Sequence, residues 1–229
     1  MISVIIPALN EETSIGKLVG YIFSDSKSKQ WLTEILVVDG GSIDDTRQKA
    51  KDAGAKIIKS EPGRGRQMNE GANCASGSIL YFLHADTFPP VGFARKIQDA
   101  LDSGFRAGCF QLAFDIDHPL MRFYGWCTRF DLSWFRFGDQ SLFITRDDFE
   151  QSGGFDSRLI VMEDNEFIRR IKKNIPFKVL EDKVITSSRK YHEVGVVKLQ
   201  LLFSSIVILY EIGVSQKVLA DWYKTVTRQ

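Results

Sequence analysis

The sequence predicts one α/β domain, with a mostly parallel, Rossmann-like central sheet flanked by helices and with apolar helices at its C-terminal end. Through the first half of the chain, short apolar segments alternate with longer amphipathic ones. This alternation is typical of a parallel sheet, because a crossover helix has to join each pair of parallel strands. The length of 229 residues and the hydrophobic content of 44% suit a single domain with a sizeable core.

The expected elements of the first half alternate regularly between strand and helix. An apolar strand at residues 3–7 precedes a helix that begins at about Glu11, whose apolar side chains recur at helical spacing. These apolar side chains are Ile15, Leu18, Val19, Ile22 and Phe23. Further strands are expected at residues 35–38, 56–59 and 79–83, and further helices at residues 46–53, 67–75 and 93–101.

The second half is less regular. Strands are expected at residues 107–117 and 141–145, and a tight turn at the glycine pair 153–154. A helix at residues 163–173 has acids at its start and bases at its end, which matches the helix dipole. Residues 118–137 are rich in aromatic side chains, which either pack in the core or form the wall of a substrate pocket. These side chains are Phe123, Tyr124, Trp126, Phe130, Trp134, Phe135 and Phe137.

Charge and cysteine content exclude several classes of protein. With 30 basic and 29 acidic residues the net charge is +1, which argues against a nucleic-acid partner bound by bulk electrostatics. The three cysteines are widely spaced, so neither a disulfide framework nor a structural zinc site is expected. The N-terminal segment is too short for a signal peptide and lacks basic flanks, so a cytoplasmic location is expected.

Residues 199–210 form an uncharged, strongly apolar segment of 12 residues. A membrane-spanning helix needs about 20 such residues, so no transmembrane span is expected. Because the segment is apolar on nearly all sides, three interpretations stay open. It packs in the core, it forms a homodimer interface, or it lies peripherally on the inner face of a membrane.

Asp39 is the first candidate site residue, because it follows the apolar residues 35–38 and precedes two glycines. In open α/β sheets, ligands bind at the carboxyl ends of the strands, where Asp39 is expected. The glycines allow positive φ angles and close approach of a ligand. The alternative is a strand-to-helix turn in which Ser42 or Asp44 caps the next helix.

Two further segments contain residues that could bind a phosphate group, either directly or through a divalent cation. Arg64 and Arg66 stand beside glycines at residues 61–66 and either clamp a diphosphate or form a solvated basic turn. His84 and Asp86 end the strand at residues 79–83 and either hold a divalent cation or cap a turn. The chain has no GxxxxGK[ST] loop, and a methionine replaces the third glycine of a dinucleotide fingerprint, which argues against both of those nucleotide-binding classes.

Glu163 and Asp164 begin the helix expected at residues 163–173. Acidic residues at a helix start are explained by charge matching with the helix dipole alone. The functional alternative is that one of the two carboxylates faces a cleft and acts as a general base.

In their order and spacing, these motifs resemble the inverting glycosyltransferases of family 2, which have the GT-A fold. The resemblance covers residues 3 to about 170, and its matching segments are residues 7–11, 38–46, 69–72, 83–86, 153–155 and 163–164. Residues 63–68 and 138–140 also resemble a small bacterial subgroup associated with arsenosugar biosynthesis.

The resemblance implies roles for the matching residues. Asp39 would bond the donor base, Pro7 and Glu11 would border the nucleotide, and Asp164 would be the catalytic base. The residues implied in substrate binding are Pro7, Glu11, Asp39, Arg64, Arg66, Asn69, Asp86 and Glu163.

The chain departs from the family pattern at the usual Asp-x-Asp motif, which reads His84-Ala85-Asp86. Asp86 and His84 are the expected ligands of a divalent cation, Mn²⁺ or Mg²⁺. An imidazole ligates manganese well, whereas it weakens a harder magnesium site. The chain also has no Gln-x-x-Arg-Trp motif, which argues against processive polysaccharide synthesis.

The implied function is transfer of one sugar, with inversion, from a nucleoside diphosphate sugar to an acceptor hydroxyl. Residues 1–117 would form the nucleotide-binding half, residues 118–190 the acceptor and catalytic half, and residues 191–229 a helical extension. One alternative is a non-catalytic nucleotide-sugar binding protein with a degenerate site. The other is a sugar-nucleotide pyrophosphorylase, but residues 7–11 do not form the Gly-rich loop that such an enzyme needs after its first strand. The donor base, the sugar and the acceptor are not predicted.

Overall fold

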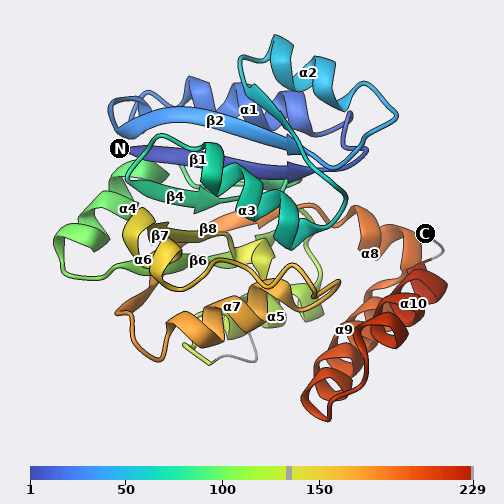
Figure 1. The fold of residues 1–229 in the computed structure, drawn as a ribbon. Coiled ribbons are helices and arrows are strands. Elements are labelled where there is room, and N and C mark those ends of the chain that lie inside the picture. Colours follow the sequence, from blue (N-terminus) through green and yellow to red (C-terminus); the bar gives the residue numbers. More distant parts are fainter. Residues whose placement is uncertain (133–135, 228–229) are drawn as a thin grey trace.

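The computed structural model describes residues 1–132 and 136–227, which form a single mixed sheet surrounded by helices (Figure 1). Across this eight-stranded sheet the strand order is β3-β2-β1-β4-β7-β6-β8-β5. The strands are β1 (Ile2–Ala8), β2 (Leu32–Asp39), β3 (Lys56–Lys59), β4 (Ile79–Phe82), β5 (Thr87–Phe88), β6 (Ala107–Phe114), β7 (Leu142–Thr145) and β8 (Phe177–Thr186).

Helices cover both faces of the sheet and continue beyond it at the C-terminal end (Figure 1). The α-helices are α1 (Ile15–Ser24), α2 (Thr46–Asp52), α3 (Arg64–Cys74), α4 (Phe93–Asp102), α5 (Pro119–Cys127), α6 (Arg146–Gln151), α7 (Glu163–Ile171), α8 (Arg189–Val194), α9 (Val196–Glu211) and α10 (Gln216–Thr227). Short 3₁₀ helices are η1 (Lys29–Trp31) and η3 (Gly138–Gln140).

The sheet is parallel where the sequence alternates regularly and mixed where it does not. Strands β3, β2, β1 and β4 are parallel neighbours, which confirms the prediction for the first half. Strand β7 runs antiparallel to both β4 and β6, and β5 runs antiparallel to β8. Strand β8 was not predicted, because the charged residues Lys178, Glu181 and Lys183 obscure its apolar pattern.

Two predicted helix starts were wrong. Helix α1 begins at Ile15, because the chain first turns at Glu11, whose backbone N–H donates to Thr46 Oγ1 at 2.8 Å. Helix α3 begins at Arg64 and not at Gln67. Its N-cap, Gly63, has φ = +131°, a conformation that glycine adopts without strain. The arginine-containing segment is therefore the first turn of a helix.

The segment of residues 118–137 contains α5. His118 caps this helix, because its side chain accepts the N–H of Leu120 at 3.2 Å, and Pro119 follows at a position that suits the first turn. Trp134 and Phe135, which were predicted to belong to the aromatic cluster, lie outside the described residues.

The core has one apolar layer on each face of the sheet. Along β1, Val4 and Ile6 pack in one layer and Ile5 packs in the other, as the alternation of side chains in a strand requires. All three side chains are fully buried, which explains why the strand reads as a continuous apolar segment. Helix α3 lies directly on this sheet at Gly71, where an added Cβ would meet Ile5 Cγ2 at 2.4 Å.

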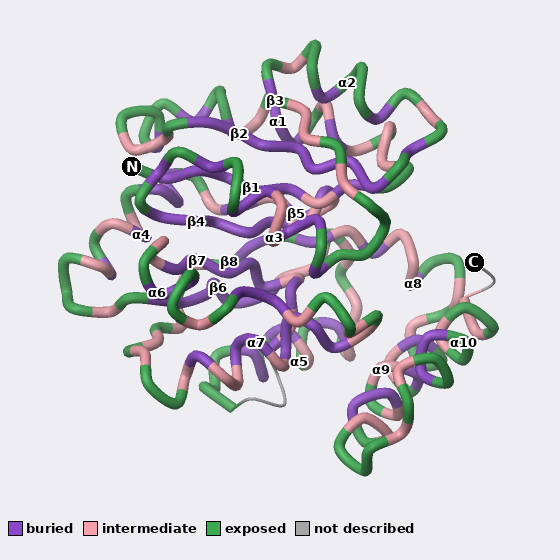
Figure 2. Tube along the Cα trace, in the orientation of Figure 1, coloured by how far each residue is buried: buried purple, intermediate pink, exposed green. Residues whose placement is uncertain are grey.

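The C-terminal helices form a third apolar cluster with the region around α5 and the start of α7. Leu199, Leu202 and Ile206 on α9 are buried, whereas Leu201 and Ile208 are 63% and 54% exposed. Figure 2 shows this mixture of buried and exposed positions along α9 and α10. Core packing is thus confirmed for one face of α9, while self-association and membrane contact stay predictions for the other. Within residues 1–132 and 136–227, no helix is long and apolar enough to cross a bilayer.

The packing of α3 on β1 leads to a test with two matched glycines. Gly71→Ala adds a methyl group against Ile5 and Val38 Cγ2, which lies 2.9 Å from the added carbon. We expect it to lower the free energy of unfolding by about 1–2 kcal/mol, because the clash outweighs the gain in helix propensity. Gly20→Ala in α1 meets no atom within 4 Å and should raise that free energy by about 0.5–1 kcal/mol. Urea denaturation measures both, and a stabilised Gly71→Ala protein would contradict the packing.

Candidate active site

A cavity of about 370 Å³ lies at the edge of the sheet where β4, β6 and β8 end. Because these three strands run in the same direction, their carboxyl ends meet at this edge. Helices α8, α9 and α10 border the cavity from outside the sheet, on the side toward which β1 and β2 also point (Figure 1). Five of the predicted site residues line it: Arg64, His84, Asp86, Glu163 and Asp164.

An ion-pair cluster joins the first turn of α3 to the first turn of α7. Arg64 Nη1 lies 2.9 Å from Glu163 Oε1 and 3.7 Å from Asp164 Oδ2. Both carboxylates sit at the N-terminus of α7, where the helix dipole favours negative charge. The cluster brings together residues that are about a hundred positions apart in the chain, and it fixes the two acids at the cavity wall.

His84 and Asp164 face each other across a gap that is too long for a hydrogen bond. His84 Nε2 lies 3.8 Å from Asp164 Oδ2 and has no hydrogen-bond partner in the described part of the chain. The backbone of Gly138 packs against both groups. A Cβ at this position would lie 2.1 Å from Asp164 Oδ2 and 2.5 Å from His84 Nε2, so any other residue would displace one or both of these groups.

The surroundings shift the pKa values of the two acids in opposite directions. Burial opposes ionisation of Asp164, but His84 and Arg64 outweigh it and hold the pKa of this carboxyl below its usual value. Burial raises the pKa of Glu163, and the charge of Arg64 only partly offsets this effect. Burial acts against a charged His84, yet the neighbouring Asp164 raises the pKa of its imidazole overall. Of these two acids, Asp164 is therefore the one that ionises more readily.

A buried arginine holds the loop that carries Gly138. Arg136 is fully buried and donates from Nη1 to the carbonyl oxygen of Thr128 at 2.7 Å and to Gln140 Oε1 at 2.5 Å. Its own carbonyl oxygen accepts from Asn165 Nδ2 at 2.8 Å, which links this loop to α7. Arg136 thus sets the position of η3 against Asp164, although it does not line the cavity.

His84 and Asp86 fit a divalent cation only as part of its ligand set. The buried, unpartnered His84 Nε2 and the Asp86 carboxylate are a donor pair that suits Mn²⁺. Among the described residues, no group of three or more His, Cys, Asp or Glu side chains could hold a metal ion. A cation there would take its other ligands from water and from substrate phosphates.

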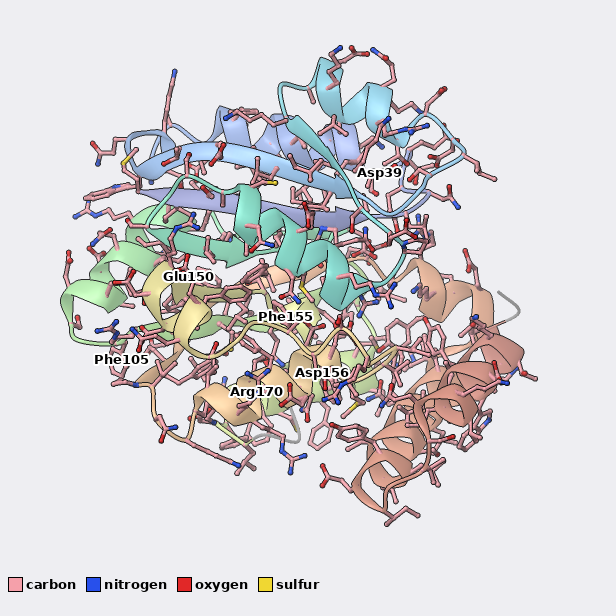
Figure 3. The ribbon with its side chains drawn as sticks, in the orientation of Figure 1. Asp39, Phe105, Glu150, Phe155, Asp156 and Arg170 are labelled. Atoms are coloured by element: carbon pink, nitrogen blue, oxygen red, sulfur yellow. The ribbon has the colours of Figure 1, made fainter. Side chains whose placement is uncertain are left out.

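Pro7, Glu11 and Asp39 do not line the cavity. Asp39 lies at the end of β2 beside α2 (Figure 3), and its carboxylate accepts the N–H groups of Ser42 at 3.1 Å and Gly41 at 3.3 Å. With 1% of its surface exposed, Asp39 stabilises its own strand-to-helix turn, and its role in binding a base stays a prediction. Glu11 Oε2 pairs with Arg189 Nη2 at 3.3 Å, and Pro7 pairs with β2 in the sheet.

Asn69 and Arg66, both on α3, also lie outside the cavity lining. Asn69 Nδ2 donates to the carbonyl oxygen of Phe155 at 2.8 Å, and Asn69 Oδ1 accepts the N–H of Phe155 at 2.9 Å. Phe155 lies below α3 in Figure 3, next to the glycine pair whose positive φ angles confirm the predicted turn. Asn69 therefore joins α3 to this turn, while Arg66 is exposed on the surface of the helix.

Other residues that were not predicted as site residues also line the cavity. Asp139 follows Gly138, and its side chain lines the cavity. In the sequence, only the resemblance of residues 138–140 to the bacterial subgroup indicated that Asp139 could belong to the site. Lys190 on α8 and Tyr223 on α10 gave no signal, because only the packing of the C-terminal helices brings them to the cavity. Lys190 Nζ donates to Tyr223 Oη at 3.0 Å.

Comparison with known proteins gives matches in sequence. The family model described as glycosyl transferase family 2 matches residues 3–155. Glucosyl-3-phosphoglycerate synthase of Mycolicibacterium smegmatis is 33% identical over 98 residues, which cover 39% of this chain and 32% of that protein. The synthase of Petrotoga mobilis is 34% identical over 125 residues, which cover 43% and 38%. The matched part therefore spans about a third of the length of these curated relatives.

Solved structures match over most of the chain. S. aureus TarS 1–349 in complex with UDP-GlcNAc has a TM-score of 0.68 and 18% identity, over 81% of this chain and 58% of that one. The mannosyltransferase PcManGT of Pyrobaculum calidifontis, in complex with GDP-Man and Mn²⁺, has a TM-score of 0.68 and 16% identity, over 99% and 68%. These similarities confirm the predicted GT-A-like fold. With the family model matching two thirds of its residues, the chain belongs to glycosyl transferase family 2.

Proposed function

We propose that this protein transfers one sugar from a nucleoside diphosphate sugar to an acceptor hydroxyl, with inversion at the anomeric carbon. The observation that carries the proposal is the position of the Asp164 carboxylate at the cavity wall between Arg64 and His84, two neighbours that lower its pKa. The neighbouring structures that bind UDP-GlcNAc or GDP-Man support this class of donor.

The chemistry assigned to Asp164 is general-base catalysis. Its carboxylate accepts the proton of the acceptor hydroxyl while the hydroxyl oxygen forms a bond to the anomeric carbon. The bond between that carbon and the diphosphate oxygen breaks, and the diphosphate leaves with the electron pair. Attack from the face opposite the leaving group inverts the configuration. A positioned base of this kind contributes about 10²–10⁴-fold to the rate.

The departing diphosphate gains negative charge, which needs stabilisation. His84 and Asp86 would hold a divalent cation, which supplies electrostatic stabilisation to the leaving phosphate oxygens. Arg64 already pairs with Glu163, so its first role is to fix the two acids of α7. The exposed Arg66, one residue beyond Gly65 in the same helix turn, remains a candidate for contact with the donor.

A nucleotide-sugar binding protein without catalysis is the second candidate. It is favoured by one observation, the replacement of the first acid of the Asp-x-Asp motif by His84. The two candidates differ in turnover, because a binding protein would bind a donor without releasing its nucleoside diphosphate.

Replacement of the proposed base gives the first test of this function. Asp164→Asn removes the proton acceptor, so we expect release of UDP or GDP from a panel of donor sugars to fall by about 10²–10⁴-fold. The dissociation constant of the donor, measured by calorimetry, should change little. The matched control is Asp156→Asn, which makes the same change outside the cavity. Unchanged turnover in Asp164→Asn would remove Asp164 from the catalytic role.

Metal dependence is tested by titration of UDP with and without Mn²⁺. In the unaltered protein we expect Mn²⁺ to tighten UDP binding, and in Asp86→Ala we expect this gain to disappear, because the carboxylate ligand is lost. His84→Asp should shift the preference toward Mg²⁺, since it replaces an imidazole by a harder oxygen ligand. A dissociation constant for UDP that is the same with and without Mn²⁺ in the unaltered protein would contradict a cation site at His84 and Asp86.

A further inference from the structure

The two sides of the cavity differ in chemistry. The side formed by the sheet, η3 and α7 carries the carboxylates of Asp86, Asp139, Glu163 and Asp164. The side formed by the C-terminal helices is mainly apolar and aromatic. Its apolar side chains are Tyr191, Leu199, Phe203, Ile206 and Tyr223.

The spacing of residues on α9 creates this apolar side. Leu199, Phe203 and Ile206 follow one another at intervals of four and three residues, so they lie on one face of the helix. All three line the cavity, whereas Leu201 on the same helix is 63% exposed and does not. The predicted helix at residues 199–210 therefore forms part of the cavity wall as well as of the core.

Aromatic contacts fix the C-terminal helices in place over the cavity. The ring of Phe203 stacks on Tyr223 with a centroid distance of 6.3 Å, and it meets Tyr191 edge-on at 6.4 Å. Tyr191 in turn packs edge-on against Phe114 at the end of β6, at 5.5 Å. The apolar side is thus held by ring contacts that run from the sheet to α10.

The charges around the cavity do not suit a small anionic acceptor. Arg64 is the only arginine among the described lining residues, and it is already paired with Glu163. Lys190 and Lys224 also line the cavity and keep their charge, but they lie on the C-terminal helices, where Lys190 donates to Tyr223 and Lys224 is exposed. A phosphate or carboxylate group needs cationic donors to offset its desolvation, and arginine forks usually supply them. The acids of the lining, which are Asp86, Asp139, Glu163 and Asp164, supply no such donor.

We infer that the acceptor is an uncharged hydroxyl compound with an apolar body, bound with its hydroxyl at Asp164 and its body along α9. This inference rests on the proposed function, because it names the acceptor of the same transfer. Burial of the apolar body against the half-buried Phe203 and the aromatic rings beside it supplies affinity, and the fixed position of α9 directs the hydroxyl toward the base. The C-terminal helices are then the element that selects the acceptor.

A panel of probe acceptors tests this inference with the unaltered protein. The probes are n-octyl β-D-glucopyranoside below its micelle concentration, methyl β-D-glucopyranoside and 3-phosphoglycerate. The first two present the same hydroxyl groups and differ only in the apolar chain. Release of nucleoside diphosphate from the best donor of the panel is measured with each probe, with product detection by mass spectrometry. We expect the octyl compound to have a KM at least about tenfold lower than the methyl compound, because several methylene groups are buried. We expect 3-phosphoglycerate to be inactive.

Variants on the two faces of α9 test whether the preference for the octyl compound depends on the face that lines the cavity. Phe203→Gln puts a polar amide on the cavity side and should raise the KM for the octyl compound by about tenfold or more, without a comparable effect on the methyl compound. Leu201→Gln makes a similar change on the exposed face and should leave both KM values as they are. The melting temperature of each variant shows whether it folds, and the comparison of probes in the unaltered protein does not depend on either variant.

The outcomes separate the inference from the proposed function. Equal KM values for the octyl and methyl compounds, or transfer to 3-phosphoglycerate in preference to both, would overturn the inference and leave glycosyl transfer intact. Failure to consume any donor, with any probe or with water, would overturn the proposed function and the inference with it. A preference for the octyl compound that disappears in Phe203→Gln and persists in Leu201→Gln would support the inference.

Discussion

The contact of Gly138 with Asp164 and His84 is the constraint on which the cavity depends. A side chain at position 138 would place its Cβ 2.1 Å from the Asp164 carboxylate, so the backbone of η3 covers the two groups in their present positions because residue 138 is glycine. Arg136 holds this backbone in place through hydrogen bonds to the carbonyl oxygen of Thr128 and to the side chain of Gln140. The enclosure removes water from one side of Asp164, and each nearby charge therefore acts on it more strongly.

This arrangement explains how two adjacent acids differ. The Glu163 carboxylate forms a short ion pair with Arg64, while the Asp164 carboxylate lies between Arg64 and His84. Burial keeps the pKa of Glu163 raised, whereas His84 and Arg64 hold the pKa of Asp164 below its usual value. Environments that push two carboxyl pKa values apart are a means by which proteins assign different roles to neighbouring acids. Glu163 serves the structure of the site, and Asp164 is available for a substrate.

The sequence was sufficient for the features that depend on local pattern. The regular alternation of the first half predicted the four parallel strands, and the acids after β4 and at the start of α7 lie at one cavity, as the order of motifs suggested. The sequence was not sufficient for features that depend on tertiary contacts. Nothing local marks Arg136 as a fully buried arginine, or Tyr223 as a residue of the cavity. At Asp39 the sequence motif is clear and predicts a ligand-binding residue. In the structure, however, the Asp39 carboxylate accepts hydrogen bonds from Gly41 and Ser42 in its own strand-to-helix turn.

The central claim is that Asp164 is ionised at the cavity while its neighbour Glu163 is the more easily protonated acid. The most direct measurement is a carboxyl ¹³C NMR titration, with the Asp164 signal assigned by comparison with Asp164→Asn. The account predicts that Asp164 titrates below the ordinary aspartate pKa of 3.8 and that Glu163 titrates above 4.5. An Asp164 carboxyl that takes up its proton near neutral pH would contradict the account, because the proposed base would then already hold the proton it has to accept.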